Sequence, residues 1–433
     1  MSGQIAENCI LTGLSELLDR PVDAASLARA RWHLLDWAGC AIAGAKEPAG
    51  AILRETQGAG AAAEAFCWGG LGNILEMDDV DKRALLHPGP SIVPAALAMA
   101  EIAQPSFETL LIAIVKGYEA TIRVGRAVGP GHYALWHNTG TCGPIGAAAA
   151  CAILLNADQR QLAHAMALAM SQATGLWQTR HDPVSMGKQL HTANAARAGF
   201  EAARLASAGF TGPLDILEGE QGFFAATCPD GDPAAVLVAP SSDWMIHEVS
   251  FKPWPACRHA HAVIDAALEL RERVDWQGDA PIRVETYLDA LKFCDRSRPQ
   301  TVIEGKFSLQ HAVAVSLARG APSLEHFELN ALNDPDLATL RARVRVESSA
   351  EFDSVYPAHF GARVSLGDQS VTIEDAMGDP ENPVSETQIK DKARMLMQAG
   401  GVSDAIARNF IEKIQNATGS VETTLKLIRE ALA

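Results

Sequence analysis

The sequence has 433 residues and a formal charge of −16, with 36 Lys and Arg against 52 Asp and Glu. Because nucleic acids and anionic membranes are bound largely through clustered Lys and Arg, this charge balance argues against both as partners. Hydrophobic residues make up 48% of the chain and charged residues 20%, which is an ordinary globular composition. The longest apolar stretch, Ala147 to Leu155, is too short for a membrane helix. Any anionic ligand must therefore be bound by a few well-placed cations.

The N-terminus and the cysteines indicate the compartment. The first 20 residues contain Glu7, Glu16 and Asp19 and lack a basic segment ahead of an apolar one, so no secretory signal is predicted. Eight cysteines are scattered along the chain without a C-x-x-C spacing, which excludes a zinc ribbon. We expect a cytoplasmic protein whose cysteines are free and mostly buried thiols.

Nearly all of the first 250 residues show the three- and four-residue apolar spacing of helices. One helix is predicted from Asp23, its N-cap, to Ala43, with Gly44 as the stop. Further helices are predicted at 94–103, 107–128, 143–155, 159–174 and 188–208. Ala and Gly at the contact positions predict a closely packed helical bundle.

The pattern changes after about residue 250. Alternating apolar residues predict strands at 282–288, 344–347, 362–366 and 371–373. The last two are joined through Gly367-Asp368 as a hairpin. Ser385 and Gln388 have the spacing of a capping box, so the remaining residues are predicted to be helical. The sequence therefore predicts a mainly α protein with a large all-helical domain, 1–250 completed by 395–433, and a smaller α+β domain, 251–394.

The first candidate for chemistry is an acidic turn. Four carboxylates lie between Glu76 and Asp81, and His87-Pro88-Gly89 follows. Alone, such a turn is interpreted as solvated and acidic. Because Pro88 and Gly89 break regular structure, His87 is predicted on a loop that enters the next helix, where it is a candidate general acid or base.

The second candidate is the segment 129–141, which contains His132, Trp136 and His137 between two helices rich in small residues. Such helices need only short connections, so a long polar loop here indicates an active-site loop. The alternative is a capping loop with surface histidines, and the sequence leaves both interpretations open.

The third candidate is Lys188, at the predicted start of a long helix that also carries His191. Free N–H groups and the positive end of the helix dipole, together with the ammonium group, favour a bound carboxylate at this position. The alternative is a solvated lysine.

The fourth candidate is the segment 252–261, at the change from helical to alternating pattern, which contains Arg258, His259 and His261. Ligand sites favour such junctions between domains. His259-x-His261 resembles half of a metal site, but no partner carboxylate stands at a suitable spacing, so no metal is expected.

Several motifs are absent from the sequence. It contains no G-x-x-x-x-G-K-[ST], no strand-led G-x-G-x-x-G, no G-x-S-x-G and no H-E-x-x-H. Nucleotide-dependent enzymes, serine hydrolases of the α/β type and zincins are therefore disfavoured, and we expect no cofactor.

Several segments together resemble the MmgE/PrpD family, which includes 2-methylcitrate dehydratase, cis-aconitate decarboxylase and iminodisuccinate epimerase. They include NILEMDDVD, LHPGPSIVPAALAMAE, HNTGTCGPIGAAAACAILL, GKQLHTANAARAGFEAARLASAGFTGP, KPWPACRHAHAVIDAALEL and DPENPVSETQIKDKARML, in the order of the family between residues 23 and 396. The resemblance implies a helical domain closed by both chain ends, an α+β domain, a homodimer and a metal-free site in the cleft between the domains. The candidate catalytic residues are His87, His137, Lys188 and His261, and the candidate substrate-binding residues are Glu76, Asp79, Arg258 and His191.

The sequence also departs from the family pattern. Glu76 stands where the decarboxylase branch has Asp, Val80 where it has Thr, and Phe293 where an active-site Tyr is expected. The loss of two hydroxyl groups leaves polar substrate groups without partners and disfavours cis-aconitate. Gly89-Pro90 replaces the Ser-Asp of the methylcitrate enzymes.

Our first hypothesis for the function is a cofactor-independent hydro-lyase, similar to 2-methylcitrate dehydratase, that acts on a small hydroxy-di- or tricarboxylate. It would abstract a proton next to a carboxylate, with Lys188 and Arg258 holding carboxylates and His137 and His87 as base and acid. One alternative is an epimerase or isomerase of an amino- or imino-dicarboxylate. The other is a catalytically idle protein that binds a carboxylate.

Overall fold

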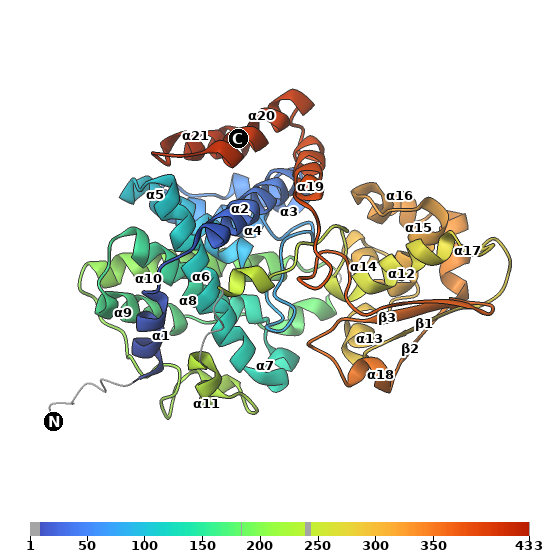
Figure 1. The fold of residues 1–433 in the computed structure, drawn as a ribbon, viewed down its shortest axis with the longest axis horizontal. Helices are drawn as coiled ribbons and strands as arrows, with labels where there is room; N and C mark the ends of the chain where they lie inside the picture. The colour runs from blue at the N-terminus through green and yellow to red at the C-terminus, as the bar shows by residue number, and fades with distance from the viewer. Residues whose placement is uncertain (1–8, 183, 239–243, 433) are drawn as a thin grey trace. The chain divides into compact units, whose positions relative to one another are not determined.

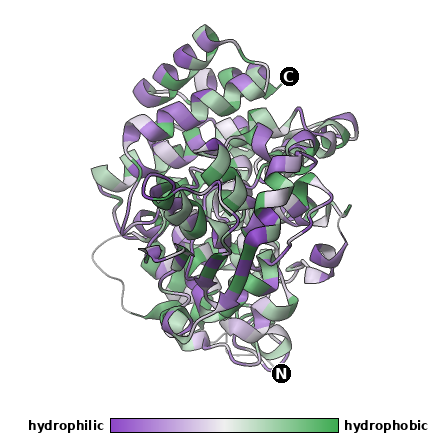
Figure 2. Cartoon of the chain, turned by 90° about the vertical axis from the view of Figure 1, so that its right-hand side faces the viewer, coloured by the Kyte–Doolittle hydropathy of each residue, from purple (hydrophilic) through white to green (hydrophobic). Residues whose placement is uncertain are grey.

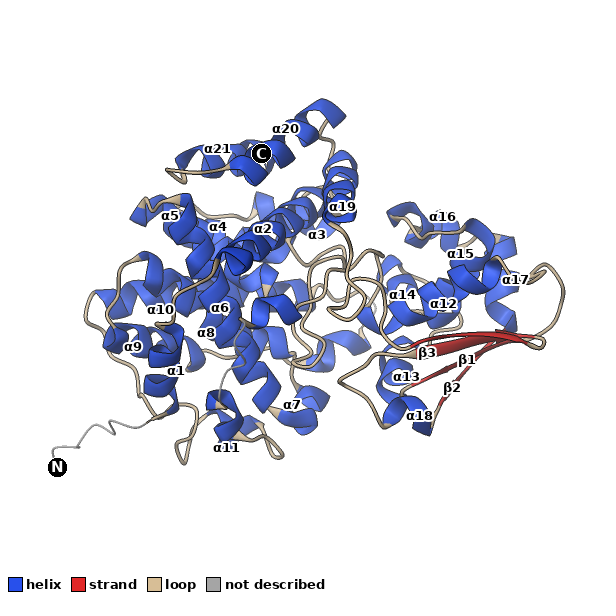
Figure 3. Ribbon diagram, in the orientation of Figure 1, coloured by secondary structure: helices blue, strands red, loops and turns tan. Residues whose placement is uncertain are grey.

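The structure is a computed structural model that describes residues 9–182, 184–238 and 244–432. The first eight residues, part of the N-terminal segment used to predict the compartment, lie outside this range. The chain divides into two compact units. The helical unit comprises Met1–Ile74, Asp78–Val249 and Glu386–Ala433, and the sheet unit comprises Leu75–Met77 and Ser250–Ser385. The fold is mainly α with one small mixed sheet, as the sequence predicts (Figure 3).

The helical unit is built from α-helices joined by 3₁₀ turns and by loops, of which the one between α4 and α5 carries the acidic turn (Figure 1). Its α-helices are α1 (Ile10–Leu18), α2 (Ala24–Gly44), α3 (Pro48–Glu55), α4 (Ala61–Leu71), α5 (Gly89–Ala103), α6 (Phe107–Ala127), α7 (Gly129–Leu135), α8 (Asn138–Leu154), α9 (Gln159–Met170), α10 (Gly187–Ser207), α11 (Phe223–Thr227), α19 (Glu386–Ala399), α20 (Asp404–Asn416) and α21 (Glu422–Leu432). Its 3₁₀ helices are η1 (Trp177–His181), η2 (Pro233–Leu237) and η3 (Met245–Glu248).

Helix α8 lies at the centre of this unit, and almost all of its residues are buried. Helices α6 and α10 pack directly against it. Glycine makes the close approach possible: a Cβ at Gly146 would lie 2.4 Å from the carbonyl oxygen of Gly117 on α6. A Cβ at Gly199 on α10 would lie 2.4 Å from the Cβ of Ala147. The predicted close packing through small residues is confirmed.

Some helix boundaries follow the sequence and others do not. The Asp23 side chain caps α2 by accepting a hydrogen bond from the Ser26 N–H at 2.9 Å, as predicted. Helices α5 and α8 begin five residues before their predicted starts, and Pro94 and Pro144 lie inside them. A proline so early in a helix removes only one interior hydrogen bond, which the surrounding packing offsets.

The predicted loop 129–141 is wrong. Helix α7 occupies Gly129–Leu135 and α8 begins at Asn138, so only Trp136 and His137 connect the two helices. The alternative of surface histidines is also wrong, because His132 and His137 are both buried.

The sheet unit contains a four-stranded mixed sheet in the order β2-β1-β3-β4. Strand β1 (Ile282–Thr286) pairs in parallel with β2 (Val344–Ser348) and antiparallel with β3 (Ala362–Leu366). Strand β4 (Gln369–Ile373) continues from β3 through a turn at Gly367, whose φ is +63°. All four strands and the hairpin were predicted. In β1 and β3, buried apolar residues alternate with more exposed polar ones.

Helices cover the sheet and complete this unit. Helix α12 packs against α15, β3 and β4, and α15 packs against α17. The helical elements are η4 (Arg258–Ala260), α12 (His261–Arg271), α13 (Leu288–Cys294), α14 (Val302–Lys306), α15 (Leu309–Arg319), η5 (Leu324–Phe327), α16 (Leu329–Leu332), α17 (Pro335–Arg343) and α18 (Ala350–Asp353).

The C-terminal helices return to the helical unit. Helix α19 begins at Glu386, next to the predicted cap Ser385, and packs against α2, with α21 against α2 and α5 (Figure 1). Near the C-terminal label, hydrophilic and hydrophobic residues alternate along the helices (Figure 2), and Leu425 and Ile428 are among the buried residues of α21.

All eight cysteines are free and buried, as the sequence predicts. Among the described residues, we find no helix with the length and apolar character needed to cross a membrane.

Candidate active site

The acidic turn between α4 and α5 is buried. Glu76, Asp78, Asp79 and Asp81 are each at most 3% exposed, so the solvated interpretation is wrong. Four buried carboxylates are tolerated only when each has a partner. Asp81, for example, pairs with Arg126 on α6 at 2.5 Å.

Asp79 accepts hydrogen bonds from three different helices. Its Oδ2 accepts hydrogen bonds from the Tyr118 hydroxyl at 2.6 Å and from His33 Nδ1 at 2.7 Å, and its Oδ1 accepts one from the Gly89 N–H at 2.9 Å. Burial raises the pKa of Asp79 to about 6. Burial likewise lowers the pKa of His33 and raises that of Tyr118. The result is a carboxylate that binds the first turn of α5 to α2 and α6, which is a positioning role.

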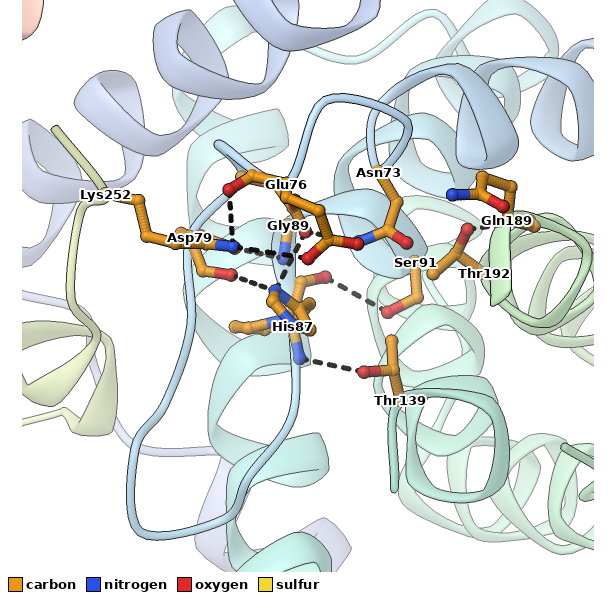
Figure 4. A network of polar contacts seen from close by, with 12 residues as sticks. Asn73, Glu76, Asp79, His87, Gly89, Ser91, Thr139, Gln189, Thr192 and Lys252 are labelled. Atoms are coloured by element: carbon orange, nitrogen blue, oxygen red, sulfur yellow. Dashed lines mark hydrogen bonds and ion pairs between the residues drawn. The ribbon is translucent and has the colours of Figure 1, made fainter. Parts of the chain in front are cut away.

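His87 lies just before α5, where the sequence placed it (Figure 4). Its Nδ1 lies 2.8 Å from the Asp79 carbonyl oxygen and 2.9 Å from Asp78 Oδ2. Both atoms are hydrogen-bond acceptors, so Nδ1 carries a proton and Nε2 is the nitrogen left to exchange one. The His87 N–H donates to the Thr139 hydroxyl at 2.9 Å, and Asn73 Nδ2 donates to Asp78 Oδ2 at 2.7 Å. These contacts fix the ring with Nε2 available for proton transfer.

His137 and His191 form a pair within the helical unit. Their Nδ1 atoms are 3.2 Å apart, so one nitrogen donates and the other accepts. His137 Nε2 is buried and has no hydrogen-bond partner among the described residues. The His137 ring lies against Trp177, with the ring centroids 4.5 Å apart. When His137 Nδ1 is the donor, its Nε2 has a lone pair and is a base; when His191 Nδ1 is the donor, the proton of the neutral His137 ring is on Nε2, which is then an acid.

Lys188 is the second residue of α10, and His191 follows one turn later. The sequence predicted this position at a helix N-terminus. Burial lowers the pKa of His137 well below its usual value, and the positive charge of Lys188 lowers it further. Burial, followed by the same charge, lowers the pKa of His191 to about 4. Both imidazoles are therefore neutral at pH 7, and Lys188 is a positive charge close to both.

The helical unit thus brings several predicted residues together. His87 and Asp78 are close enough to His137 to affect its pKa, as are Lys188 and His191. Three histidines, a carboxylate and an ammonium group are an arrangement suited to binding an anion and moving a proton beside it.

Glu76 belongs to the sheet unit, together with two buried lysines. Lys252 Nζ donates to the Glu76 carbonyl oxygen at 2.7 Å and lies 3.7 Å from its Oε2 (Figure 4). Lys306 Nζ donates to the Leu75 carbonyl oxygen at 3.1 Å. Glu76 has a φ of +58°, which is unusual for a residue other than glycine. Two buried ammonium groups therefore hold this strained piece of backbone.

Arg258 and His261 are buried in the sheet unit and engaged with each other. Arg258 Nη1 donates to His261 Nδ1 at 3.1 Å, and His261 Nε2 donates to the Ala256 carbonyl oxygen at 3.2 Å. Arg258 also pairs with Asp379. Both ring nitrogens of His261 thus bind groups of its own unit, so the structure favours neither a proton-transfer role for His261 nor a substrate-binding role for Arg258. Both roles stay predictions.

An aromatic group surrounds His259. Phe293, which stands where a tyrosine was expected, stacks on the His259 ring with centroids 5.1 Å apart. A hydroxyl group next to the His259 ring is supplied by Tyr287, whose oxygen lies 2.7 Å from His259 Nδ1. Burial lowers the pKa of His259 to about 4.

Two groups of three potential metal ligands occur among the described residues, and both lie in the sheet unit. One comprises His359, Glu374 and Asp375, and the other Asp375, Asp379 and Glu381. Neither includes a predicted catalytic residue, nor His259 and His261. The groups are acidic and partly exposed, which is common without a metal.

Sequence analysis missed the partners that hold the candidate residues. His33 and Tyr118 lie 46 and 39 residues from Asp79 in the sequence. Each lies among the apolar residues of a helix. The only indication in the sequence is a polar side chain at a position expected to be buried. The acidic turn indicated Asp78, but only the structure shows that it binds His87.

The chain belongs to the MmgE/PrpD family. Residues 18–235 match the MmgE/PrpD N-terminal domain, and residues 254–416 match the MmgE/PrpD C-terminal domain. The second match includes α19 and α20, which pack in the helical unit.

Curated relatives match over most of the chain. A cis-aconitate decarboxylase-like protein, oryM, of Aspergillus oryzae is 26% identical, with 95% of this chain and 93% of that protein aligned. The cis-aconitate decarboxylase of Mus musculus is 26% identical over 83% of this chain and 75% of its own. That of Homo sapiens is 28% identical over 74% and 69%.

Proposed function

We propose that this protein is a lyase that acts on a small di- or tricarboxylate, moving a proton at the carbon next to a carboxylate without a cofactor. The observation that carries this proposal is His137 Nε2, which is buried without a partner among the described residues, on a ring linked to His191. Lys188 is close enough to lower the pKa of both rings. The names of the relatives support the same class of reaction.

Lys188 would bind a substrate carboxylate at the N-terminus of α10. The first N–H groups of a helix have no partner in the helix, and its dipole is positive there, so an anion is stabilised by both and by the ammonium group. Carboxylate binding also stabilises the transition state, because negative charge develops on that group when the neighbouring carbon loses its proton.

The two histidine centres would divide the proton transfers. With its proton on Nδ1, His137 presents Nε2 as a base, and His191 accepts the Nδ1 proton once Nε2 has been protonated. His87 is fixed by Asp78 and by the Asp79 carbonyl oxygen, and its Nε2 would be the second proton-transfer atom. Positioned acid and base groups of this kind typically contribute about 10²- to 10⁴-fold in rate.

Two lyase reactions use such a pair. In dehydration, which the sequence predicts, a base removes the proton next to the carboxylate and an acid protonates the departing hydroxyl group. In decarboxylation, which the names of the relatives favour, the C–C bond to a carboxylate breaks and CO₂ leaves. The electron pair stays on carbon, which then takes a proton from the histidine acid.

The family membership also motivates proposals about assembly. We propose that the protein is a homodimer. Each chain would have two domains, one formed by residues 1–250 and 395–433 and the other by residues 251–394. Glu76 and Arg258 would bind the substrate, and His261 would be catalytic.

The test is proton NMR of the purified protein in D₂O with methylcitrate, citrate, cis-aconitate and malate offered separately. A new vinylic signal from a hydroxy acid would establish dehydration. Loss of the cis-aconitate signal with release of CO₂ would establish decarboxylation. Deuterium entering the substrate without net reaction would favour an epimerase, and no change with any acid would contradict the proposal.

Two variants with matched controls test the residues. His137→Ala and Lys188→Met should each lower kcat/KM by about 10²-fold or more. His164→Ala and Lys116→Met should stay within about twofold, because His164 is a buried histidine of α9 bonded to a backbone carbonyl group and Lys116 is a half-buried lysine of α6. Wild-type turnover in both test variants would refute the assignment.

A further inference from the structure

The sheet unit contains a pocket of about 540 Å³ that includes none of the candidate active-site residues. It is formed by the connection between α13 and α14, the end of α16, the outer turns of α17 and the start of β2. Three arginines line it: Arg298, Arg341 and Arg345. Gln300 and Asn333 add amide groups, and no acidic or aromatic residue is part of the lining.

None of these three arginines forms an ion pair with a carboxylate among the described residues. Arg341 is only 6% exposed, and its guanidinium donates to His311 Nδ1 at 3.0 Å and to the Leu332 carbonyl oxygen at 2.7 Å. Arg345 Nη1 donates to the Ala342 carbonyl oxygen at 2.7 Å. The bonding partners are therefore neutral groups.

The surrounding groups offset this charge only in part. Asp334, beside the lining residue Asn333, is close enough to favour the charged form of Arg341, but it already pairs with Arg319 at 2.7 Å. His311 accepts from Arg341 at Nδ1 and lies 2.8 Å from the His326 carbonyl oxygen at Nε2, so its ring is neutral. Burial lowers the pKa of His311 to about 4, in agreement with a neutral ring.

Three unpaired guanidinium groups around one pocket repel one another, which is unfavourable unless an anion binds between them. The arrangement is more notable because acidic residues outnumber basic ones by 52 to 36 in this chain, so carboxylate partners are plentiful. Guanidinium groups bind carboxylates and phosphates through paired N–H donors. Without an aromatic residue in the lining, there is no surface on which a nucleotide base would stack.

We propose that this pocket binds a small polyanion, a molecule with at least two carboxylate or phosphate groups and no aromatic part. Arg298, Arg341 and Arg345 supply the charge, and Gln300 and Asn333 supply further hydrogen bonds. The site is separate from the candidate active site and does not depend on the proposed lyase function.

The test is isothermal titration calorimetry of the full chain with citrate and, separately, with pyrophosphate, at constant ionic strength. The two probes distinguish a preference for carboxylates from one for phosphates. The pocket variant is Arg298→Ala with Arg345→Ala, because both side chains are exposed and the buried Arg341 remains. The control variant is Arg273→Ala with Arg283→Ala, which removes two exposed arginines from the same unit.

Wild-type protein should bind at least one probe saturably. The pocket variant should weaken that binding by about tenfold or more, and the control variant should stay within about twofold. Binding of citrate at the candidate active site would persist in both variants. Equal binding by all three proteins, equal weakening in both variants, or no saturable binding of either probe would overturn the proposal.

Discussion

A buried ion pair joins the C-terminal segment to the rest of the helical unit. Lys392 on α19 lies 2.6 Å from Asp36 on α2, and the two side chains are 7% and 2% exposed. Burial raises the pKa of Asp36; the charge and hydrogen bond of Lys392 oppose this shift, and the charge of nearby Asp79 adds to it. We predict that Lys392→Met, or Asp36→Asn, destabilises the protein strongly.

The expected size follows from the geometry. At an effective dielectric constant of about 20, charges separated by this distance attract by about 6 kcal/mol. Desolvation of both groups offsets much of that gain, so the intact pair contributes little net free energy. Removing one partner leaves the other charge buried alone, which typically costs about 3–5 kcal/mol. The double variant removes both charges and should cost less than the sum of the single variants by at least about 2 kcal/mol.

The assay is urea denaturation at pH 7 of wild type, both single variants and the double variant. Lys426→Met is the control, because Lys426 pairs with Glu430 at 3.9 Å on the exposed face of α21 and should lose less than about 1 kcal/mol. Single variants that lose less than about 1 kcal/mol, or losses that add in the double variant, would refute the argument that the pair is buried and coupled.

Three further predictions concern individual residues. The fold raises the pKa of Asp79 from 3.8 to about 6, so the folded protein holds this proton more tightly than the unfolded chain does. The resulting stabilisation is complete below about pH 4, and about 3 kcal/mol of it is lost as the pH rises through 6. Urea titrations at several pH values should show that loss in wild type but not in Asp79→Asn, and parallel curves would contradict it. Gly378→Ala should lower the free energy of unfolding by about 2–4 kcal/mol, because φ at this position is +97° and the new Cβ would lie 1.9 Å from the Phe251 carbonyl oxygen. A free energy within about 0.5 kcal/mol of wild type would show that the loop adjusts. Lys252→Met should cost about 2–4 kcal/mol in the same assay, because Glu76 loses its buried cation, and an unchanged midpoint would exclude that role.

The sequence predicted features that depend on neighbouring residues. Asp23 caps α2 because its side chain reaches the N–H three residues later. Lys188 lies in the first turn of α10, which begins at Gly187. The strands were predictable because alternation reports one buried face of the sheet. Pro94 and Pro144 misled the analysis, because proline ends a helix in isolation but not when tertiary packing offsets a lost hydrogen bond.

The candidate site was predictable only in part. Individual residues such as His87 and His137 stand out by their type and their position at helix starts. The protonation states of these histidines could not be predicted from the sequence, because they depend on contacts between distant segments. The 3.2 Å separation between the Nδ1 atoms of His137 and His191 joins residues 54 positions apart.

The turn between α4 and α5 contains residues of both units. Glu76 is held by Lys252 in the sheet unit, and Asp78, two residues later, belongs to the helical unit and holds His87 Nδ1. Only Met77 separates the two carboxylates in the sequence. Glu76 has a φ of +58°, and the side chains of Glu76 and Asp78 have different partners, Lys252 and His87. The buried contacts of Glu76 with Lys252 and of Asp78 with His87 help to offset the cost of the positive φ at Glu76.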